Sequence, residues 1–222
     1  MKSKRKFLSI LLMLTVVLSM SFAAVPACAA TNGTAISTAD DLKAMENTPG
    51  GSYYLANDIE VPANLILFTS YDAPFTGTLD GNGHAIKGYT YTASADWTEQ
   101  AALFGYAKNA TFKNLKMTEV NISLNQAGTA AALVAASENC KFTDISVSGK
   151  IVGKSLSTAA GIVAYSYEGG TLTNCKNSAD ITITNADEGS DAAGVAGFIG
   201  SAGSMKNCSN SGNLSISGSI CF

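Results

Sequence analysis

The feature that most constrains the fold of this chain is a repeat in its second half. Four segments align, and they begin at Ala101, Ala131, Ala160 and Ala193. One aligned column holds Phe112, Phe142, Leu172 and Met205, at steps of 30, 30 and 33 residues. Each unit contains two or three short alternating stretches and no helical period, and it buries its apolar face only by stacking on its neighbours. We therefore predict an all-β fold, a solenoid built from stacked turns of short strands.

The other aligned columns have physical roles in such a solenoid. Two inward stacks are expected, an aliphatic one at Leu103, Leu133, Ile162 and Val195, and one of small residues at Ala101, Ala131, Ala160 and Ala193. A further column holds Asn114, Asp144, Asn174 and Asn207. Short polar side chains tolerate unusual backbone angles at bends and can hydrogen-bond along the stack. We predict that this column forms a structural ladder from turn to turn.

The segment before the repeat predicts a cap and the first turns. Thr38 stands three residues before Asp41, as in a helix N-cap, so a short helix is expected from Ser37 to Glu46. Such a helix would close one end of the solenoid. The stretch "LDGNGHAI" supplies a Gly-Asn-Gly turn. We assign residues 31–99 to the cap and first turns, and residues 100–222 to repeated turns of about 30 residues.

The first thirty residues are typical of an export signal. Its basic start holds Lys2, Lys4, Arg5 and Lys6. The apolar stretch "FLSILLMLTVVLSM" follows, and "AVPACAA" offers a cleavage site near Ala29 or Ala30. Two alternatives stay open, an uncleaved membrane anchor and a lipoprotein signal with Cys28 as the lipidated residue. We expect a protein that is secreted or held at the cell surface.

The charge of the remaining chain argues against two classes of partner. The signal holds four of the fourteen basic residues and none of the seventeen acidic ones, which leaves a net charge of −7 for the rest. A surface of this sign is a poor match for nucleic acid or anionic lipid. No later stretch is long and apolar enough to span a bilayer. We expect no nucleic-acid partner, and no membrane contact beyond a lipid at Cys28.

The units "AGIVAY...LTNCKNSADI" and "AGVAGF...MKNCSNSGNL" resemble those of right-handed parallel β-helix proteins that carry GLUG-type repeats. Such repeats occur in secreted and surface proteins of bacteria. The resemblance extends upstream through "ISTADDLKAM", "GSYYLANDIEV" and "FTGTLDGNGHAIKGY" and covers nearly all of the exported chain. It implies a pectate-lyase-like fold, a right-handed parallel β-helix, and an adhesin-like, non-enzymatic surface module with an extended interaction face.

Many β-helices act on polysaccharides, so catalysis is the competing hypothesis. By resemblance, pectate lyases need an arginine base and calcium-binding acids, whereas the only arginine here is Arg5 in the signal. Asp80 and His84 share one turn, but no second acidic motif repeats on the same face. We expect no catalytic residue and no cofactor, and keep a carbohydrate-binding module or a polysaccharide lyase or hydrolase as the alternative.

Four cysteines follow the signal, at Cys140, Cys175, Cys208 and Cys221. There is one histidine and no closely spaced cysteine pair, so no metal site is expected. Cys175 and Cys208 share a column and would lie about 4.8 Å apart on adjacent turns. Either they form a disulfide, which export permits, or they are small buried side chains in the place of Leu115 and Ile145.

Aromatic residues are the candidates for ligand contact. Tyr89, Tyr91 and Trp97 could stack on sugar rings if they are exposed on one face. Tyr106 and Tyr165 occupy equivalent positions in two units, but both neighbouring columns are partly apolar, so alternation does not decide which way they face. A separate acidic stretch with Asp187, Glu188 and Asp191 is expected to be a solvated loop, because its spacing does not match a calcium loop.

The last unit runs to "LSISGSICF", and no capping segment follows. An uncovered solenoid end exposes a strand edge and an apolar cross-section. We expect an incomplete C-terminal end that belongs to a truncated longer protein or stacks on another chain. The expected partners are therefore a cell-surface polysaccharide or a protein chain on this open end.

Overall fold

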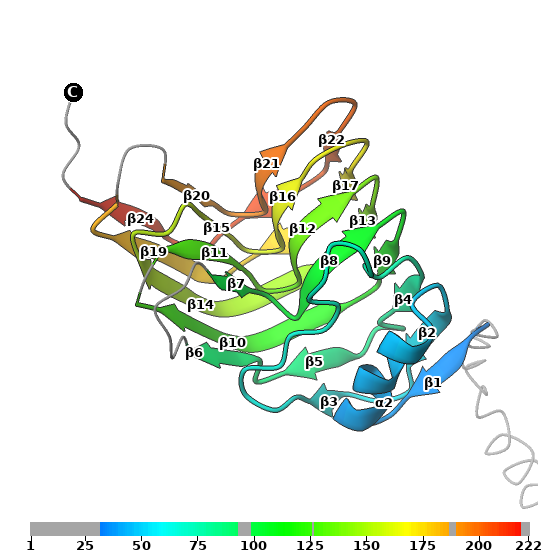
Figure 1. Cartoon of the computed structure of the whole chain (residues 1–222). Coiled ribbons are helices and arrows are strands. Elements are labelled where there is room, and N and C mark those ends of the chain that lie inside the picture. The colour runs from blue at the N-terminus through cyan, green and yellow to red at the C-terminus, as the bar shows by residue number, and fades with distance from the viewer. Residues whose placement is uncertain (1–31, 93–98, 126, 187–189, 219–222) are drawn as a thin grey trace, which may run out of the picture. The chain divides into compact units, whose positions relative to one another are not determined.

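A computed structural model of the chain describes residues 32–92, 99–125, 127–186 and 190–218. The expectations for the export signal with Cys28, and for Trp97, Asp187, Glu188 and Cys221, lie outside these residues. Residues 32–222 form one compact unit. Figure 1 shows this unit as a β-solenoid in which short strands stack turn upon turn.

The strands belong to four sheets, and every named pairing is parallel. In one sheet each strand pairs with the next in this order: β1 (Thr34–Ile36), β2 (Ser52–Leu55), β4 (Thr78–Asp80), β9 (Thr111–Lys113), β13 (Lys141–Thr143), β17 (Thr171–Thr173) and β22 (Ser204–Lys206). A second sheet holds β3 (Ile59–Glu60), β5 (Ala85–Lys87), β6 (Thr90–Thr92), β10 (Lys116–Leu124), β14 (Ser146–Lys154), β18 (Lys176–Asn177), β19 (Asp180–Thr184), β23 (Ser209–Asn210) and β24 (Leu214–Ser217).

Two shorter sheets complete each turn of the repeated part. The first holds β7 (Glu99–Ala101), β11 (Gly128–Ala131), β15 (Thr158–Ala160) and β20 (Asp191–Ala193). The other holds β8 (Phe104–Lys108), β12 (Val134–Glu138), β16 (Val163–Ser166) and β21 (Ala196–Ile199). Figure 1 shows these two sheets next to each other at an angle. The candidate site lies where these two sheets adjoin, because its lining includes Gln100 of β7 and Tyr106 of β8.

The aromatic and aliphatic column predicted from the repeat is confirmed. Phe112 pairs with Phe142, Phe142 with Leu172, and Leu172 with Met205. The rings of Phe112 and Phe142 stack with centroids 5.3 Å apart. The predicted aliphatic stack is buried as well, at Leu103, Leu133, Ile162 and Val195.

The predicted inward alanine stack is wrong at three of its four positions, because the inward column that begins at Ala101 continues through Ala130 and Ala159. Ala101 pairs with Ala130 rather than with Ala131, whereas Ala131 pairs with Ala160 as expected. Because successive side chains of a strand point to opposite faces, this slip places Ala101 and Ala131 on different sides of their sheet. Ala101 lies in the main core, and Ala131 belongs to a second cluster of small residues with Ala102.

The predicted capping helix is confirmed and is shorter than expected. The helix α2 spans Ala39–Ala44 and continues as a 3-10 turn over Met45–Asn47. The Asp41 amide donates to Thr38 Oγ1 at 3.1 Å, and the Thr38 amide donates to Asp41 Oδ2 at 2.9 Å, which completes a capping box. Leu42 and Met45 are fully buried, so the helix closes the first turn. In the part that the structure describes, no helix is long and apolar enough to cross a membrane.

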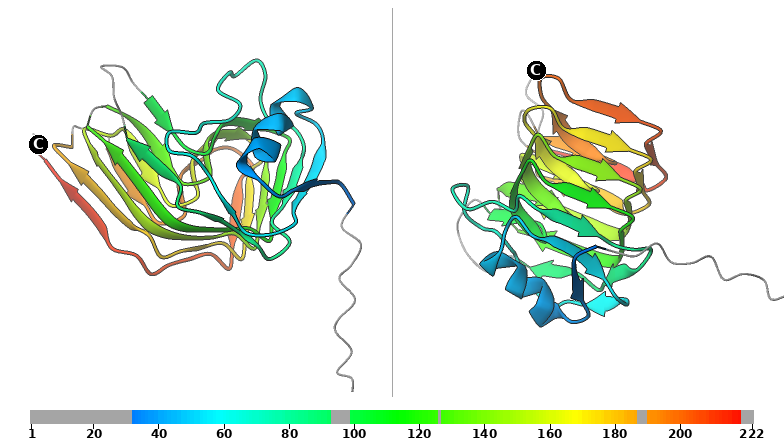
Figure 2. Two further views of the ribbon diagram at one scale, coloured as in Figure 1. Left: turned by 90° about the horizontal axis from the view of Figure 1, so that it is seen from below. Right: turned by 90° about the vertical axis from the view of Figure 1, so that its right-hand side faces the viewer.

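The two ends of the stack differ. Figure 2 shows α2 against the first turn and strand after strand stacked away from it. On the last described turn, Met205, Leu214 and Ile216 are 44%, 45% and 45% exposed. Their partners one turn earlier, Leu172, Ile181 and Ile183, are fully buried. The C-terminal end of the described stack therefore presents an uncovered apolar face.

Candidate functional site

A row of aromatic side chains crosses the sheet of β8, β12, β16 and β21. Ala136 pairs with Tyr106 on one side and with Tyr165 on the other, and Tyr165 pairs with Phe198. Tyr106 and Tyr165 are half-buried, and Phe198 is exposed. The row thus reads Tyr, Ala, Tyr, Phe from strand to strand. The structure answers the question of direction left open by the sequence, because both tyrosines lie on the outside of the solenoid.

A second row lies beside the first. Lys108 pairs with Glu138, and the Tyr167 amide donates to the Ser137 carbonyl, which places Tyr167 beside Glu138. The rings of Tyr165 and Tyr167 stack with centroids 5.8 Å apart and planes 5° apart. Partial burial, together with nearby phenols, raises the pKa of Tyr167. The two rows therefore contact each other through the stacked rings of Tyr165 and Tyr167.

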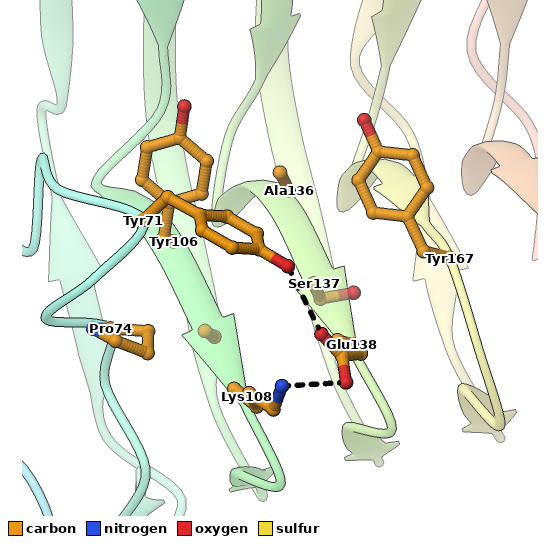
Figure 3. Close-up of a pocket in the computed structure, with 9 residues that line it drawn as sticks. Tyr71, Pro74, Tyr106, Lys108, Ala136, Ser137, Glu138 and Tyr167 are labelled. Atoms are coloured by element: carbon orange, nitrogen blue, oxygen red, sulfur yellow. Dashed lines mark hydrogen bonds and ion pairs between the residues drawn. The ribbon is translucent and has the colours of Figure 1, made fainter.

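The loop of residues 61–77 adds Tyr71 to these rows. Its ring meets the ring of Tyr106 edge-on, with centroids 5.7 Å apart. The Tyr71 hydroxyl donates to Glu138 Oε2 at 3.5 Å (Figure 3). Other residues of the loop anchor it, since Leu67 and Phe75 bridge to β8 and the Phe68 amide donates to Glu46 Oε1 at 2.7 Å. Tyr71 therefore sits on a fixed segment although its own side chain is exposed.

These side chains surround a groove of about 570 Å³. Its lining consists of Tyr71, Gln100, Tyr106, Lys108, Glu138, Tyr167 and Glu168, and we call it the aromatic groove. Ala136, Ser137 and Pro74 line an adjoining hollow at its base. Figure 3 shows Tyr71 and Tyr106 on one side of Ala136 and Tyr167 on the other. The groove combines aromatic faces with a few polar groups, as small-molecule and glycan sites do.

An ion pair spans the groove. Lys108 Nζ lies 2.8 Å from Glu138 Oε1, and this hydrogen bond raises the pKa of Lys108. Both side chains remain partly exposed, so solvent screens the pair and it contributes little to stability. Its main effect is to present a fixed donor and a fixed acceptor side by side.

Cross-sheet hydrogen bonds hold two of the phenols. Gln100 Nε2 donates to Tyr106 Oη at 2.9 Å, and Thr158 Oγ1 donates to Tyr165 Oη at 2.7 Å. Beneath them lies the second cluster of small residues, formed by Ala102, Ala131, Ala135 and Ala164 with Tyr165 packed against it. These small side chains allow the two shorter sheets to approach, and the bonds between the sheets limit the freedom of the rings.

The aromatic site expected at Tyr89, Tyr91 and Trp97 is not formed by the two tyrosines. Tyr89 is fully buried and Tyr91 is 9% exposed. In β6, Thr90 and Thr92 face outward, so alternation turns Tyr91 inward. Among the residues that the structure describes, the Tyr89 hydroxyl has no hydrogen-bond partner, and burial raises its pKa well above the usual value. Neither ring can serve as an exposed platform, and Trp97 lies outside the described residues.

Two groove residues were missed at the level of sequence. Tyr167 stands two residues after Tyr165, so alternation along one strand could have placed both rings on the same face. Tyr71 lies in a loop with no repeat partner, and no sequence signal places it at the groove.

The Asn and Asp column has the backbone that a ladder requires. Asn114, Asp144, Asn174 and Asn207 all have positive φ, between 51° and 55°. Asn174 Nδ2 donates to Asp144 Oδ1 at 3.0 Å, and Asn207 Nδ2 donates to Asn174 Oδ1 at 3.2 Å. Asn114 Nδ2 donates instead to Asp80 Oδ1 at 3.0 Å. A second column, with Asn139 Nδ2 donating to Asn109 Oδ1 at 2.7 Å, runs along another bend.

Asp80 and His84 belong to separate polar clusters. Asp80 pairs with Lys113 at 3.0 Å and accepts from the Asn82 amide. His84 Nδ1 lies 3.4 Å from Asp58, which also pairs with Lys87 at 2.7 Å. The hydrogen bond from Lys87 is the main reason that the pKa of Asp58 falls to about 2. These carboxylates are thus held ionised by their neighbours. Across the described ranges, no group of three or more His, Cys, Asp and Glu residues could hold a metal ion.

Cys175 and Cys208 are free thiols in the structure. Cys175 is fully buried, and burial raises its pKa to about 12. Cys208 is half-buried one turn further on, where its thiol donates to the Leu172 carbonyl at 3.5 Å. The disulfide between them stays a prediction.

Taken together, the parallel strand pairing and the groove define a β-solenoid module with an aromatic groove on its surface. A family model described as the M26 IgA1-specific metallo-endopeptidase N-terminal region matches residues 21–149, and the chain belongs to this family. The narrower resemblance to GLUG-type repeats stays a prediction.

One solved structure is also similar. It comes from Bacteroides ovatus and is described as a candidate immunoglobulin A1 protease; it is 18% identical, with 83% of this chain and 79% of that chain covered. The TM-score between the two structures is 0.36. A search among curated proteins found no match.

Proposed function

We propose that this chain is a non-catalytic, exported β-solenoid module that binds a partner in the aromatic groove. The observation that carries the proposal is the groove itself. Tyr71 comes from a loop, Tyr106 from β8, and Tyr167 from the position after the end of β16, and the three converge around the ion pair of Lys108 and Glu138. Exposed, clustered aromatic rings beside a few polar groups are typical of interaction sites.

Two further observations support a binding role. The family is named as the N-terminal region of a metallo-endopeptidase, which favours an extracellular module that accompanies an enzyme. In the sequence, the only arginine lies in the expected signal and the only histidine is His84. His84 lies beside Asp58, a carboxylate already paired with Lys87, and not in the groove.

Binding and release assays on one set of variants test the proposal. The full chain, recovered after export, is incubated with immunoglobulin A1, an unrelated immunoglobulin and a panel of polysaccharides, and both retention and release of reducing or unsaturated ends are recorded. We expect retention without release. Tyr71→Ala and Tyr167→Ala should weaken retention, whereas Tyr54→Ala, on the separate strand β2, should not. Product release abolished by Asp80→Asn or His84→Ala would overturn the proposal in favour of an enzyme.

A further inference from the structure

Most lysines of the repeat lie on two of the four sheets. Residues 31–98 hold two lysines and eight acidic residues, whereas residues 99–222 hold eight lysines and nine acidic residues. Of these eight lysines, only Lys108 belongs to the two shorter sheets, and the other seven lie on β9, β10, β13, β14, β18 and β22 of the two longer ones. In the described part of residues 99–218, the longer sheets and the bend between them carry three carboxylates, at Glu119, Asp144 and Asp180. These two sheets of the repeat are therefore basic, although the chain as a whole is acidic.

Six of these seven lysines have no ion-pair partner within the described residues. Lys113 pairs with Asp80 at 3.0 Å, and it is the exception. The other six are exposed. The nearby carboxylates of Asp144 and Asp180 accept hydrogen bonds from asparagine side chains instead, at 3.0 Å in both cases. Six ammonium groups are thus available to an anion from solution.

Three of the unpaired lysines flank the bend that joins the two longer sheets. Lys206 precedes the bend at the end of β22, and Lys116 and Lys176 follow it at the starts of β10 and β18. Lys116 pairs with Ser146, and Ser146 pairs with Lys176. These two lysines therefore stand two strand spacings apart, or roughly 9.6 Å. We call Lys116, Lys176 and Lys206 the lysine bend.

A surface groove of about 500 Å³ lies at this bend. Its lining consists of Asp144, Ile145, Ser146, Asn174, Lys176 and Asn207. Hydrogen bonds from Asn174 to Asp144 and from Asn207 to Asn174 hold these side chains in place from turn to turn. The groove thus offers a cation beside hydroxyl and amide groups, with one carboxylate and no aromatic ring.

The spacing of the charges favours an acidic polysaccharide over nucleic acid. Duplex DNA carries one negative charge per about 1.7 Å of its axis, whereas Lys116 and Lys176 supply two cations over roughly 9.6 Å. Proteins that bind single strands stack the bases on aromatic rings, which the lining of this groove lacks. A chain of uronate rings carries one carboxylate per ring, and its hydroxyls can bond to Ser146 and to the amides.

We propose that the lysine bend binds one strand of an acidic polysaccharide, which lies along the stack with its carboxylates at Lys116, Lys176 and Lys206. Asp144 is the one carboxylate of the groove, so it opposes the ligand and limits its affinity. This groove shares no lining residue with the aromatic groove. The inference therefore goes beyond the proposed function and does not depend on it.

Calorimetry on the full chain tests the lysine bend. The probes are oligogalacturonate, its fully methyl-esterified form as the uncharged match, a hyaluronan oligosaccharide and a DNA duplex. The bend variant combines Lys116→Gln with Lys176→Gln. Its matched control combines Lys43→Gln with Lys154→Gln, which removes the same charge from the helix α2 and from the far end of β14. A third variant, Asp144→Asn, removes the opposing carboxylate, and thermal melts verify that all variants fold.

We expect at least one of the two uronate probes to bind, with an affinity that falls as salt is added, and the esterified form not to bind. The bend variant should weaken binding about tenfold or more, and the matched control and Tyr71→Ala should leave it unchanged. Asp144→Asn should tighten binding, which a merely damaged fold would not do.

Four outcomes would overturn the inference. They are an equal loss in the matched control, equal binding of the esterified form, tighter binding of the DNA duplex, and no binding of either uronate probe. Because Tyr71→Ala reports on the aromatic groove separately, each of these outcomes leaves the proposed function to its own assay.

Discussion

Asn174 Nδ2 donates a 3.0 Å hydrogen bond to Asp144 Oδ1. The carboxylate of Asp144 has no N–H group of its own, so it cannot donate the next hydrogen bond of the ladder to Asn114. The ladder is therefore broken into two pieces, one that joins Asn207, Asn174 and Asp144, and one that joins Asn114 to Asp80. The break follows from side-chain chemistry alone, because the backbone at all four column positions is nearly the same.

The break can be repaired by one substitution. Asp144→Asn keeps the acceptor for Asn174, adds a donor toward Asn114, and is compatible with the φ of 54°. We expect a gain of about 0.5–1.5 kcal/mol in the free energy of unfolding, measured with urea. Asn174→Ala should instead lose about 1–3 kcal/mol, since it removes two hydrogen bonds and replaces asparagine, which tolerates a φ of 55°, by a residue that does not. Equal stability of the two variants would contradict the ladder.

The buried hydroxyl of Tyr89 should destabilise the native state. The described part of the chain offers this fully buried hydroxyl no hydrogen-bond partner, so Tyr89→Phe removes an unsatisfied group and keeps the ring. We expect Tyr89→Phe to stabilise the chain by about 1 kcal/mol in urea unfolding. Tyr53→Phe is the matched control, because Tyr53 Oη donates to the Thr48 carbonyl at 2.6 Å, and its loss should destabilise. A destabilising Tyr89→Phe would show that the hydroxyl has a bound partner.

The thermal stability of the chain should fall at low pH, in part because Asp58 becomes protonated. The pKa of Asp58 is about 2 in the folded chain against 3.8 for the unperturbed group, mainly because Lys87 donates to it. Since the folded pKa is the lower one, this contribution is present above about pH 4 and is lost as the pH falls toward 2. Melting temperatures measured across this range should fall less steeply in Asp58→Asn and in Lys87→Met than in the parent chain. Parallel curves would contradict the assignment.

The cysteines should differ in reactivity. Burial raises the pKa of Cys140 to about 11 and that of Cys175 to about 12, and both thiols are inaccessible. Cys208 is half-buried. We expect a thiol reagent under native conditions to modify Cys208 well before Cys140 or Cys175, as read by peptide mass spectrometry. If Cys175 and Cys208 instead appear as one linked peptide pair, the disulfide hypothesis holds.

Much of the fold could be predicted from the sequence because the repeat carries unambiguous markers. Large residues such as Phe112 and Phe142 align without ambiguity, and Thr38 with Asp41 marks the helix start. The register at Ala101 could not be read in this way. The next unit offers Ala130, Ala131 and Ala132 in succession, and identical small side chains do not reveal which of them faces the core.

The candidate site was less predictable for a related reason. The outer face around Tyr165 is itself packed with alanines, so both faces of the strand are apolar. The sequence of this strand therefore lacks the alternation of polar and apolar residues that would tell the inner face from the outer one. Tyr71 reaches the groove through a loop held by Leu67 and Phe75, and such contacts depend on the folded chain rather than on any period.

The difference between the two ends of the stack also limits how copies of this chain could assemble. One end is closed by the helix with Leu42 and Met45, and the exposed face with Leu214 and Ile216 lies at the other. If two copies meet through that face, each uses the same surface, so the contact is isologous and closes at a pair. Head-to-tail stacking through that face would need an apolar surface at the other end, where Leu42 and Met45 are buried under the helix. The cap therefore disfavours head-to-tail stacking of the described turns.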